Sequence, residues 1–276
     1  MQNNHALKIC FIGGGNMATA LIGGLAGKLT DGVNIHVVDL NVDSLGRLHQ
    51  KFGVSTAEQI DAKLADADVI VLAVKPQQMR GVVLQILPHL GAQVILSIAA
   101  GIRGVDLSRW LNGYGAIVRT MPNTPALIGQ GITGMVALPG VSASQRAATD
   151  AIMRAVGATV WLDDEALIDP VTAVSGSGPA YVFYFIEAMQ QAALEMGLTQ
   201  QQGMQLALAT FTGAAQLAAQ SDEPIALLRE RVTSKGGTTH AALMSMEADG
   251  VKDAIVRALK AAAARGKELG EEFGRD

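Results

Sequence analysis

The chain has 276 residues, of which 49% are hydrophobic but only 4% aromatic, and its formal net charge at pH 7 is −4. This length allows two domains with sizeable cores, and the mainly aliphatic apolar content suits closely packed helices. A slightly acidic chain has no broad basic field, so nucleic acid is not expected as a partner. The single cysteine, Cys10, lies in an apolar run and is interpreted as a buried core residue, because one thiol cannot build a disulfide framework.

The first residues, Met1–His5, lack the basic region and hydrophobic core of a signal peptide. The most apolar stretch of the second half, Pro179–Met196, contains two glutamates and two glutamines. It predicts a buried helix rather than a membrane span. A cytoplasmic protein with no membrane partner is therefore expected.

Short β-branched runs alternate with helical patterns from Leu7 to Leu162. Strands are expected at Leu7–Ile12, Asn34–Leu40, Val69–Val74, Val94–Ile98, Ala116–Met121, Met135–Leu138 and Ala158–Leu162. Helices are expected at Asn41–Phe52, Gln77–Leu90 and Ala143–Val156, the last with a capping box from Ser142 and Gln145. This alternation predicts right-handed βαβ units and an α/β domain over residues 1–162 with a mainly parallel sheet.

The pattern changes after Trp161, because no convincing strand follows. Helices are expected at Pro179–Met196, Thr199–Gln220, Pro224–Arg231, Thr239–Ala248 and Val251–Glu272. The sequence thus predicts a separate all-α domain over residues 163–276.

A glycine turn joins the first strand to the first helix. Gly13-Gly-Gly15-Asn16-Met17-Ala18 fits G-x-G-x-x-A, which cradles a dinucleotide. Gly13 would make the tight turn, Gly15 would admit the pyrophosphate, and Ala18 would allow the helix to pack on the strand. A glycine-rich turn without a ligand is the alternative, and a P-loop is excluded because no G-K-[ST] follows.

Three later strand ends extend this candidate cofactor site. Asp39, after the second strand, is placed to accept hydrogen bonds from the adenosine ribose, or alternatively to cap the following helix. The segment Ala73-Val74-Lys75-Pro76 follows the next strand, and Lys75 could touch a phosphate or ribose, or could be solvated. Ala100 lies in a small-residue segment with room for a flat nicotinamide ring.

The segment Val232–Leu243, VTSKGGTTHAAL, places two glycines and three hydroxyl side chains before a helical run. A loop that opens a helix in this way presents free N–H groups and the positive end of the helix dipole. It therefore suits a small carboxylate. A cofactor turn near one end of the chain and an anion loop near the other indicate a redox enzyme.

Absences narrow the chemistry of this enzyme. The chain has no Tyr-x-x-x-Lys pair, no lysine between Pro76 and Ser234, and no histidine between Leu90 and Thr239. A carbonyl reductase usually needs such a proton donor, whereas an imine nitrogen can arrive already protonated. No His/Cys/Asp cluster has the spacing of metal ligands, so no metal is expected.

Six blocks in order carry a resemblance to the pyrroline-5-carboxylate reductase family along essentially the whole chain. They are GGGNMA (13–18), AVKP (73–76), SIAAGI (97–102), RTMPNTPA (119–126), VSGSGPAY (174–181) and VTSKGGTT (232–239). The resemblance implies an N-terminal Rossmann domain, an α-helical dimerisation domain and homodimers that often assemble into decamers. It also implies reduction of (S)-1-pyrroline-5-carboxylate to L-proline by NADPH or NADH.

The resemblance also assigns site residues. Gly13 to Ala18, Val74, Lys75 and Ala100 match segments that contact the cofactor. Ser234 with the backbone of Gly237, Thr238 and Thr239 matches a cradle for the substrate carboxylate. Thr239 matches the hydroxyl that approaches the ring nitrogen, and Glu165 falls near a substrate-proximal acid. Lys235 departs from the family pattern, in which proline is common at this position.

Two other functions remain open at this stage. A β-hydroxyacid-dehydrogenase-like oxidoreductase shares the glycine start and a helical second domain, but it would need a catalytic lysine on a helix there, and no lysine lies between Pro76 and Ser234. A non-catalytic dinucleotide-binding module would keep the glycine turn but would not need the C-terminal loop. The resemblance favours NADPH, whereas Asp39, with no basic residue before Arg47, predicts that NADH is also used well.

Overall fold

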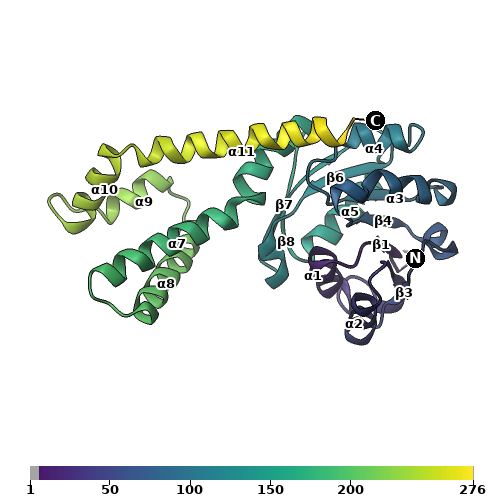
Figure 1. Ribbon diagram of the computed structural model, residues 1–276, viewed down its shortest axis with the longest axis horizontal. Coiled ribbons are helices and arrows are strands. Elements are labelled where there is room, and N and C mark those ends of the chain that lie inside the picture. Colours follow the sequence, from purple (N-terminus) through teal and green to yellow (C-terminus); the bar gives the residue numbers. More distant parts are fainter. Residues whose placement is uncertain (1–5, 276) are drawn as a thin grey trace. The chain divides into compact units, whose positions relative to one another are not determined.

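The computed structural model describes residues 6–275, which form two compact units. The sheet unit comprises Met1–Ser177 and Ala261–Asp276, and the helical unit comprises Gly178–Lys260. The ribbon in Figure 1 labels the elements. The division differs from the boundary expected at 162/163, because residues 163–177 and the last part of the C-terminal helix both belong to the sheet unit.

Eight strands of the described residues form one sheet in the order β3-β2-β1-β4-β5-β6-β7-β8. Their bounds are β1 Ile9–Ile12, β2 Ile35–Val38, β3 Ser55–Ala57, β4 Val69–Leu72, β5 Val94–Ser97, β6 Ile117–Met121, β7 Gly131–Ala137 and β8 Gly157–Trp161. All neighbouring pairs are parallel except β6 and β7. The expected mainly parallel α/β sheet is therefore confirmed.

The sheet is covered on both faces, which is why β1, β2, β4 and β5 are buried at every position. One face packs against α1 (Asn16–Leu25), α2 (Val42–Phe52) and α5 (Ala143–Arg154). The other face packs against α3 (Met79–Ile86) and α4 (Gly104–Trp110). Cys10 is fully buried on this second face, as expected, and burial raises the pKa of its thiol to about 12.

The helical unit consists of α7 (Gly178–Glu195), α8 (Gln200–Ala219), α9 (Ile225–Arg231), α10 (Thr238–Ala248) and the start of α11 (Val251–Phe273). A capping box formed by Thr199 and Gln202 begins α8. Phe185 of α7 and Phe211 of α8 place their ring centroids 6.4 Å apart. No strand lies in the described part of this unit, in agreement with the expected all-α region.

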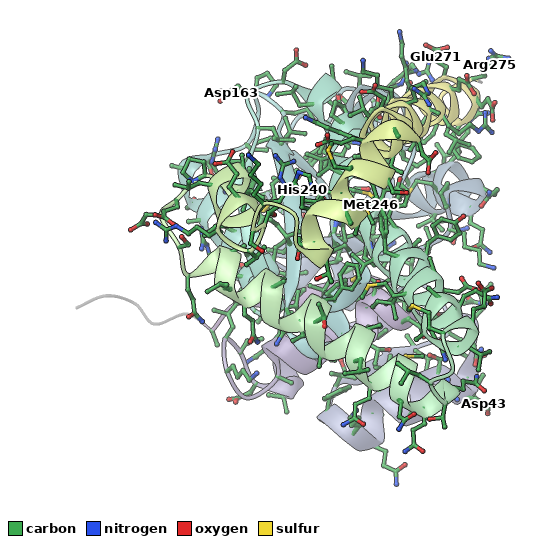
Figure 2. All side chains as sticks on the ribbon, turned by 90° about the vertical axis from the view of Figure 1, so that its left-hand side faces the viewer. Asp43, Asp163, His240, Met246, Glu271 and Arg275 are labelled. Carbon is green, nitrogen blue, oxygen red and sulfur yellow. The ribbon has the colours of Figure 1, made fainter. Side chains whose placement is uncertain are left out.

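Large apolar side chains remain exposed on the helical unit. Phe183 is 65% exposed and Tyr184 is 71% exposed, and Met246, labelled near the end of α10 in Figure 2, is 51% exposed. Such a surface on a single copy marks a protein interface. Over residues 6–275, none of the helices combines the length and apolar character needed to cross a membrane.

Several elements differ from the sequence prediction. The strand β3 and the helix α4 were not predicted, and β7 begins at Gly131 rather than Met135. A π-helical turn, Thr172–Gly176, precedes α7 and overlaps the start of VSGSGPAY. The capping box of Ser142 and Gln145 is confirmed at the start of α5. The missed strand has only three residues and is half-buried, so it carries almost no hydrophobic pattern.

Candidate active site

The glycine turn between β1 and α1 lies at the topological switch point of the sheet, where the strand order reverses. Strands β2 and β3 lie on one side of β1, and β4 and β5 lie on the other. Gly13 has φ +104, and a Cβ atom there would lie 2.5 Å from the Ala73 carbonyl oxygen. Only glycine fits both constraints. The turn therefore presses directly on the end of β4, at the crevice where open α/β sheets bind ligands.

Two side chains hold the next residue, Gly14. Its N–H donates to Asp39 Oδ2 at 2.6 Å, and its carbonyl accepts from Ser44 Oγ at 2.8 Å. The other Asp39 oxygen accepts from the Asn41 N–H at 2.8 Å. Asn41, rather than Asp39, caps α2 by accepting from the Ser44 N–H. The alternative of Asp39 as helix cap is therefore wrong.

Helix α1 begins with an open anion position. Its N-cap residue is Gly15, where a Cβ atom would meet nothing within 4 Å, and its first turn contains no acidic side chain. The N–H groups of the first turn, from Asn16 to Ala18, have no partner within the helix. Ala18 is 1% exposed and packs in the core below. The free space, the N–H groups and the dipole fit the pyrophosphate of a dinucleotide.

The neighbouring strand ends supply the other predicted cofactor residues. Ala73 continues β4 and its N–H donates to the Ile12 carbonyl, while Val74 is half-buried. Lys75 is exposed, and Pro76 opens a short 3-10 turn. Ala100, exposed, follows β5, which pairs with β4. All of the predicted cofactor segments thus lie along one edge of the sheet.

The predicted carboxylate loop belongs to the helical unit. The Gly237 N–H donates to the Ser234 carbonyl at 3.0 Å, and Gly236 takes a left-handed φ of +74. Gly237 is the N-cap of α10, so the helix begins at Thr238, one residue before the prediction. Its first turn has no acidic side chain and contains Thr239. His240, labelled in Figure 2, follows in the same turn. The loop offers a second unneutralised helix N-terminus.

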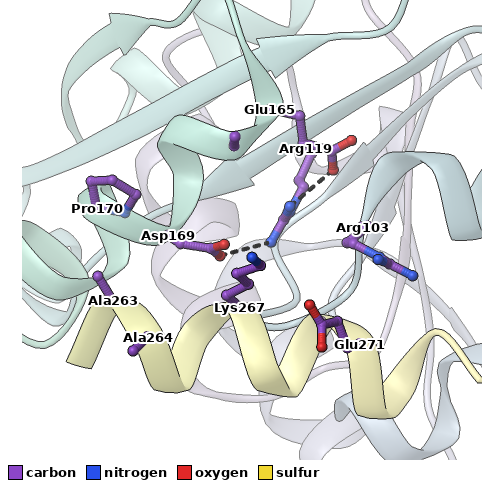
Figure 3. Close-up of a pocket in the computed structure, with 11 residues that line it drawn as sticks. Arg103, Arg119, Glu165, Asp169, Pro170, Ala263, Ala264, Lys267 and Glu271 are labelled. Atoms are coloured by element: carbon purple, nitrogen blue, oxygen red, sulfur yellow. Dashed lines mark hydrogen bonds and ion pairs between the residues drawn. The ribbon is translucent and has the colours of Figure 1, made fainter. Parts of the chain in front are cut away.

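Glu165 lies in the sheet unit, in the short turn that follows β8. Its Oε1 accepts from the Gly104 N–H at 2.5 Å and from Arg119 Nη1 at 2.9 Å. Arg119 Nη2 also lies 4.0 Å from Asp169, whose pKa is raised by burial. These groups border a cavity of about 520 Å³ that also meets the end of α11 (Figure 3).

The structure thus gathers the predicted cofactor residues at one sheet edge and four of the predicted substrate residues in one segment, with Glu165 in a charge cluster of the sheet unit. Sequence reasoning gave no role to Ser44 or Arg119. A charged residue inside an apolar strand pattern was the available signal for Arg119. Asn123, within the block RTMPNTPA, donates to the Ser175 carbonyl and accepts from the Ile132 N–H.

Comparison with known proteins identifies the family. Residues 165–269 match the family described as pyrroline-5-carboxylate reductase dimerisation, and residues 8–101 match the family described as NADP oxidoreductase coenzyme F420-dependent. The chain is 45% identical over 268 residues to a pyrroline-5-carboxylate reductase from Pseudomonas aeruginosa, covering 97% of this chain and 98% of the relative. The chain belongs to the pyrroline-5-carboxylate reductase family.

Solved structures of family members agree with this assignment. A pyrroline-5-carboxylate reductase from Coxiella burnetii has a TM-score of 0.90 and 38% identity, over 96% of this chain and 99% of that one. The Plasmodium falciparum enzyme, solved with NADP bound, has a TM-score of 0.85 and 30% identity, over 98% and 99% of the two chains. The sheet-plus-helical architecture is therefore that of the family.

Proposed function

We propose that the chain reduces the cyclic imine (S)-1-pyrroline-5-carboxylate to L-proline, the last step of proline biosynthesis, with NADPH or NADH. The observation that carries this proposal is the presence of both anion loops in a chain with 45% identity to a pyrroline-5-carboxylate reductase over 97% of its length. A β-hydroxyacid dehydrogenase and a non-catalytic module are disfavoured by the same finding.

The cofactor is assigned to the edge of the sheet formed by β1, β4 and β5. Gly13, Gly15 and the first N–H groups of α1 hold the pyrophosphate, and Asp39 faces the adenosine ribose. The segment 73–76 and Ala100 line the path toward the nicotinamide. When bound, the reduced cofactor supplies the hydride that the imine carbon accepts.

The substrate carboxylate is assigned to the loop before α10. Ser234 offers a hydroxyl, and the N–H groups of Thr238 and Thr239 lie in the first turn of α10, where a helix N-terminus favours negative charge. The backbone of Gly237 shapes this cradle, because its N–H donates to the Ser234 carbonyl. The Thr239 hydroxyl is assigned to the ring nitrogen, which it orients for attack at the adjacent carbon. A direct substrate contact by Glu165 stays a prediction.

The protonation chemistry suits this set of residues. The loop contains no strong acid, and the imine nitrogen can carry its proton from solution before hydride arrives. Exposed Lys235 adds a positive charge beside the carboxylate position, which favours the approach of an anionic substrate.

The exposed apolar surface of the helical unit is assigned to a homodimer, in keeping with the dimerisation family that matches residues 165–269. Further assembly of such dimers into a decamer, and a cytoplasmic location, are proposed from the family. Sedimentation at micromolar concentration tests the assembly, and a folded, active monomer would contradict it.

Oxidation of NADPH and NADH by the purified protein, followed at the nicotinamide absorbance with pyrroline-5-carboxylate as substrate, tests the reaction. Proline should form in an amount equal to the cofactor consumed. Parallel assays with a small 2-oxo acid and a 3-oxo acid serve as controls. Turnover of an oxo acid in place of the imine would replace this proposal with the dehydrogenase alternative.

A further inference from the structure

The loop that connects β5 to α4, residues 98–103, has no regular secondary structure and contains Ala100, to which the proposed function assigns the nicotinamide. Gly101 takes a left-handed φ of +72. Ala99 and Ile102 of this loop are buried in the core, whereas Ala100 between them is exposed. The turn at Ala100 and Gly101 therefore depends on contacts from outside the loop. Two separate features of the sheet unit contact it, and neither takes part in the cofactor segments described above.

The first support acts on the end of the loop. The Gly104 N–H, which opens α4, donates to Glu165 Oε1 at 2.5 Å, and the same oxygen accepts from Arg119 Nη1 at 2.9 Å. The Arg119 side chain is only 4% exposed. In Figure 3 this guanidinium lies between Glu165 and Asp169. A buried, paired arginine thus fixes the carboxylate that holds the loop end.

The second support is the C-terminal end of α11, which packs on the middle of the loop. A Cβ atom at Gly101 would lie 3.1 Å from Phe273 Cδ2 and 3.2 Å from Leu269 Cβ. Phe273 packs against the same core as α3 and α4. The helix end therefore presses on the loop closely enough that even a methyl group would be tight.

Polar contacts anchor this helix end to α4. Arg109 Nη2 donates to the Gly274 carbonyl at 2.5 Å. Arg103, the last loop residue, pairs with Asp106 at 2.5 Å, and Gly274 lies against both side chains of that pair. Gly274 is buried, so this contact excludes solvent. The C-terminal segment is consequently attached both to the last residue of the loop, Arg103, and to helix α4, through Asp106 and Arg109.

We propose that the segment 269–274 and the Arg119–Glu165 pair are positioning residues for the reaction. They hold the loop of residues 98–103 in the conformation that receives the nicotinamide ring. This inference rests on the proposed function, because that function places the nicotinamide at Ala100. Hydride transfer is sensitive to small errors in the distance between donor and acceptor, so loosening either support lowers kcat while the adenosine end of the cofactor still binds.

The test compares Phe273→Ala with Phe273→Leu and with Phe52→Ala. Phe52 is an aromatic residue of similar half-buried character in the same unit, but it packs on the opposite face of the sheet. The readouts are kcat, the Kd of ADP-ribose measured by calorimetry, and the nicotinamide fluorescence of bound NADH. ADP-ribose lacks the nicotinamide and so reports the other end of the site.

Phe273→Ala is expected to lower kcat by about 10- to 100-fold, the scale of a misplacement of about 1 Å, and to change the nicotinamide fluorescence. The Kd of ADP-ribose should stay the same, and Phe273→Leu should restore most of kcat. Phe52→Ala should lower the melting temperature, but it should not lower kcat while leaving the Kd of ADP-ribose unchanged. Equal kcat and fluorescence in Phe273→Ala and wild type, or equal losses of kcat and of ADP-ribose affinity, would overturn the inference.

Glu165→Gln tests the other support and keeps the side-chain volume, so it serves even if Phe273→Ala does not fold. A positioning role changes kcat and the fluorescence of NADH in the absence of substrate. A substrate contact instead raises KM for the imine and leaves that fluorescence unchanged, which would count against the inference. The fluorescence readout needs no turnover, so it tests the supports even if wild type reduces no imine.

Discussion

The two anion loops differ in how the surrounding structure holds them. The glycine turn at Gly13 is braced by a neighbouring strand and by the Asp39 and Ser44 side chains. The loop before α10 is held by local contacts, which are a backbone bond from Gly237 to Ser234 and two bonds from Thr233 to the carbonyls of Arg229 and Glu230. The first loop is thus supported by residues 25 to 60 positions away in the chain, whereas the contacts of the second come from residues three or four positions away. The loop assigned to the cofactor and the loop assigned to the substrate therefore differ in how strongly the rest of the sequence fixes their conformation.

The largest expected effect tests whether the second loop acts on the substrate alone. Thr239→Ala should lower kcat/KM by about 10- to 1,000-fold, because one oriented hydrogen bond to the reacting group is lost. The Kd of NADPH, measured by fluorescence, should barely change, since the cofactor is assigned to the other loop. Loss of cofactor binding with normal turnover of the residual complex would show that the two loops do not divide the work in this way.

A matched pair of glycine substitutions tests the difference in bracing. Gly13→Ala should lower the free energy of unfolding by more than the about 1–3 kcal/mol that a strained backbone costs, because its Cβ would also overlap the Ala73 carbonyl. Gly236→Ala should cost only about 1–2 kcal/mol, since its Cβ would meet nothing within 4 Å. Thermal unfolding followed by circular dichroism measures both. Equal losses would mean that the glycine turn is not braced by β4.

The two side chains that bond to Gly14, Asp39 and Ser44, allow support of the loop to be tested separately from the choice between NADH and NADPH. Ser44→Ala removes one hydrogen bond, worth about 1 kcal/mol, and should weaken NADH and NADPH binding by the same factor of about five. Asp39→Ser also removes a negative charge, so it should shift the ratio of kcat/KM values toward NADPH. If that ratio is the same in wild type and Asp39→Ser, the carboxylate only supports the loop.

The smallest expected effect is the pH dependence of the stability of the sheet unit, which carries the glycine turn at Gly13. Burial lowers the pKa of His36 on β2 below its ordinary value of 6.5, against the opposing effect of Asp61, whose carboxylate lies 3.3 Å away. The neutral ring therefore stabilises the fold above pH 6.5, and this contribution is lost as pH falls toward the lowered pKa.

The melting temperature of wild type should accordingly fall between pH 7 and pH 5. His36→Gln should show a smaller fall over the same interval. A fall of the same size in both proteins would assign the acid sensitivity to other groups.

Sequence patterns predicted the fold well where periodicity was strong. The buried strands, the helix α2 and the capping box of Ser142 all followed from apolar spacing and cap chemistry. The prediction missed β3 and α4, because three residues carry no period and α4 begins with glycine directly after a small-residue loop. The contact of the α11 end with the sheet unit could not be predicted, since an amphipathic helix does not reveal its partner.

For the candidate site, the sequence identified the two loops but not the groups that hold them. The sequence predicted a tight turn at Gly13, because glycine tolerates a positive φ, and the φ of +104 at Gly13 agrees with this. The bonds from Gly14 to Asp39 and Ser44 join residues 25 to 30 positions apart, and no local pattern encodes such contacts. The same holds for Glu165, whose bond to the Gly104 N–H crosses 61 positions.

The division of the chain also has a consequence for its synthesis. The sheet unit includes residues 261–276, which leave the ribosome after the entire helical unit. Residues 178–260 can therefore complete their own contacts while the sheet unit still lacks Leu269 and Phe273. The loop of residues 98–103 therefore gains its contacts with Leu269 and Phe273 only after the whole helical unit has been synthesised.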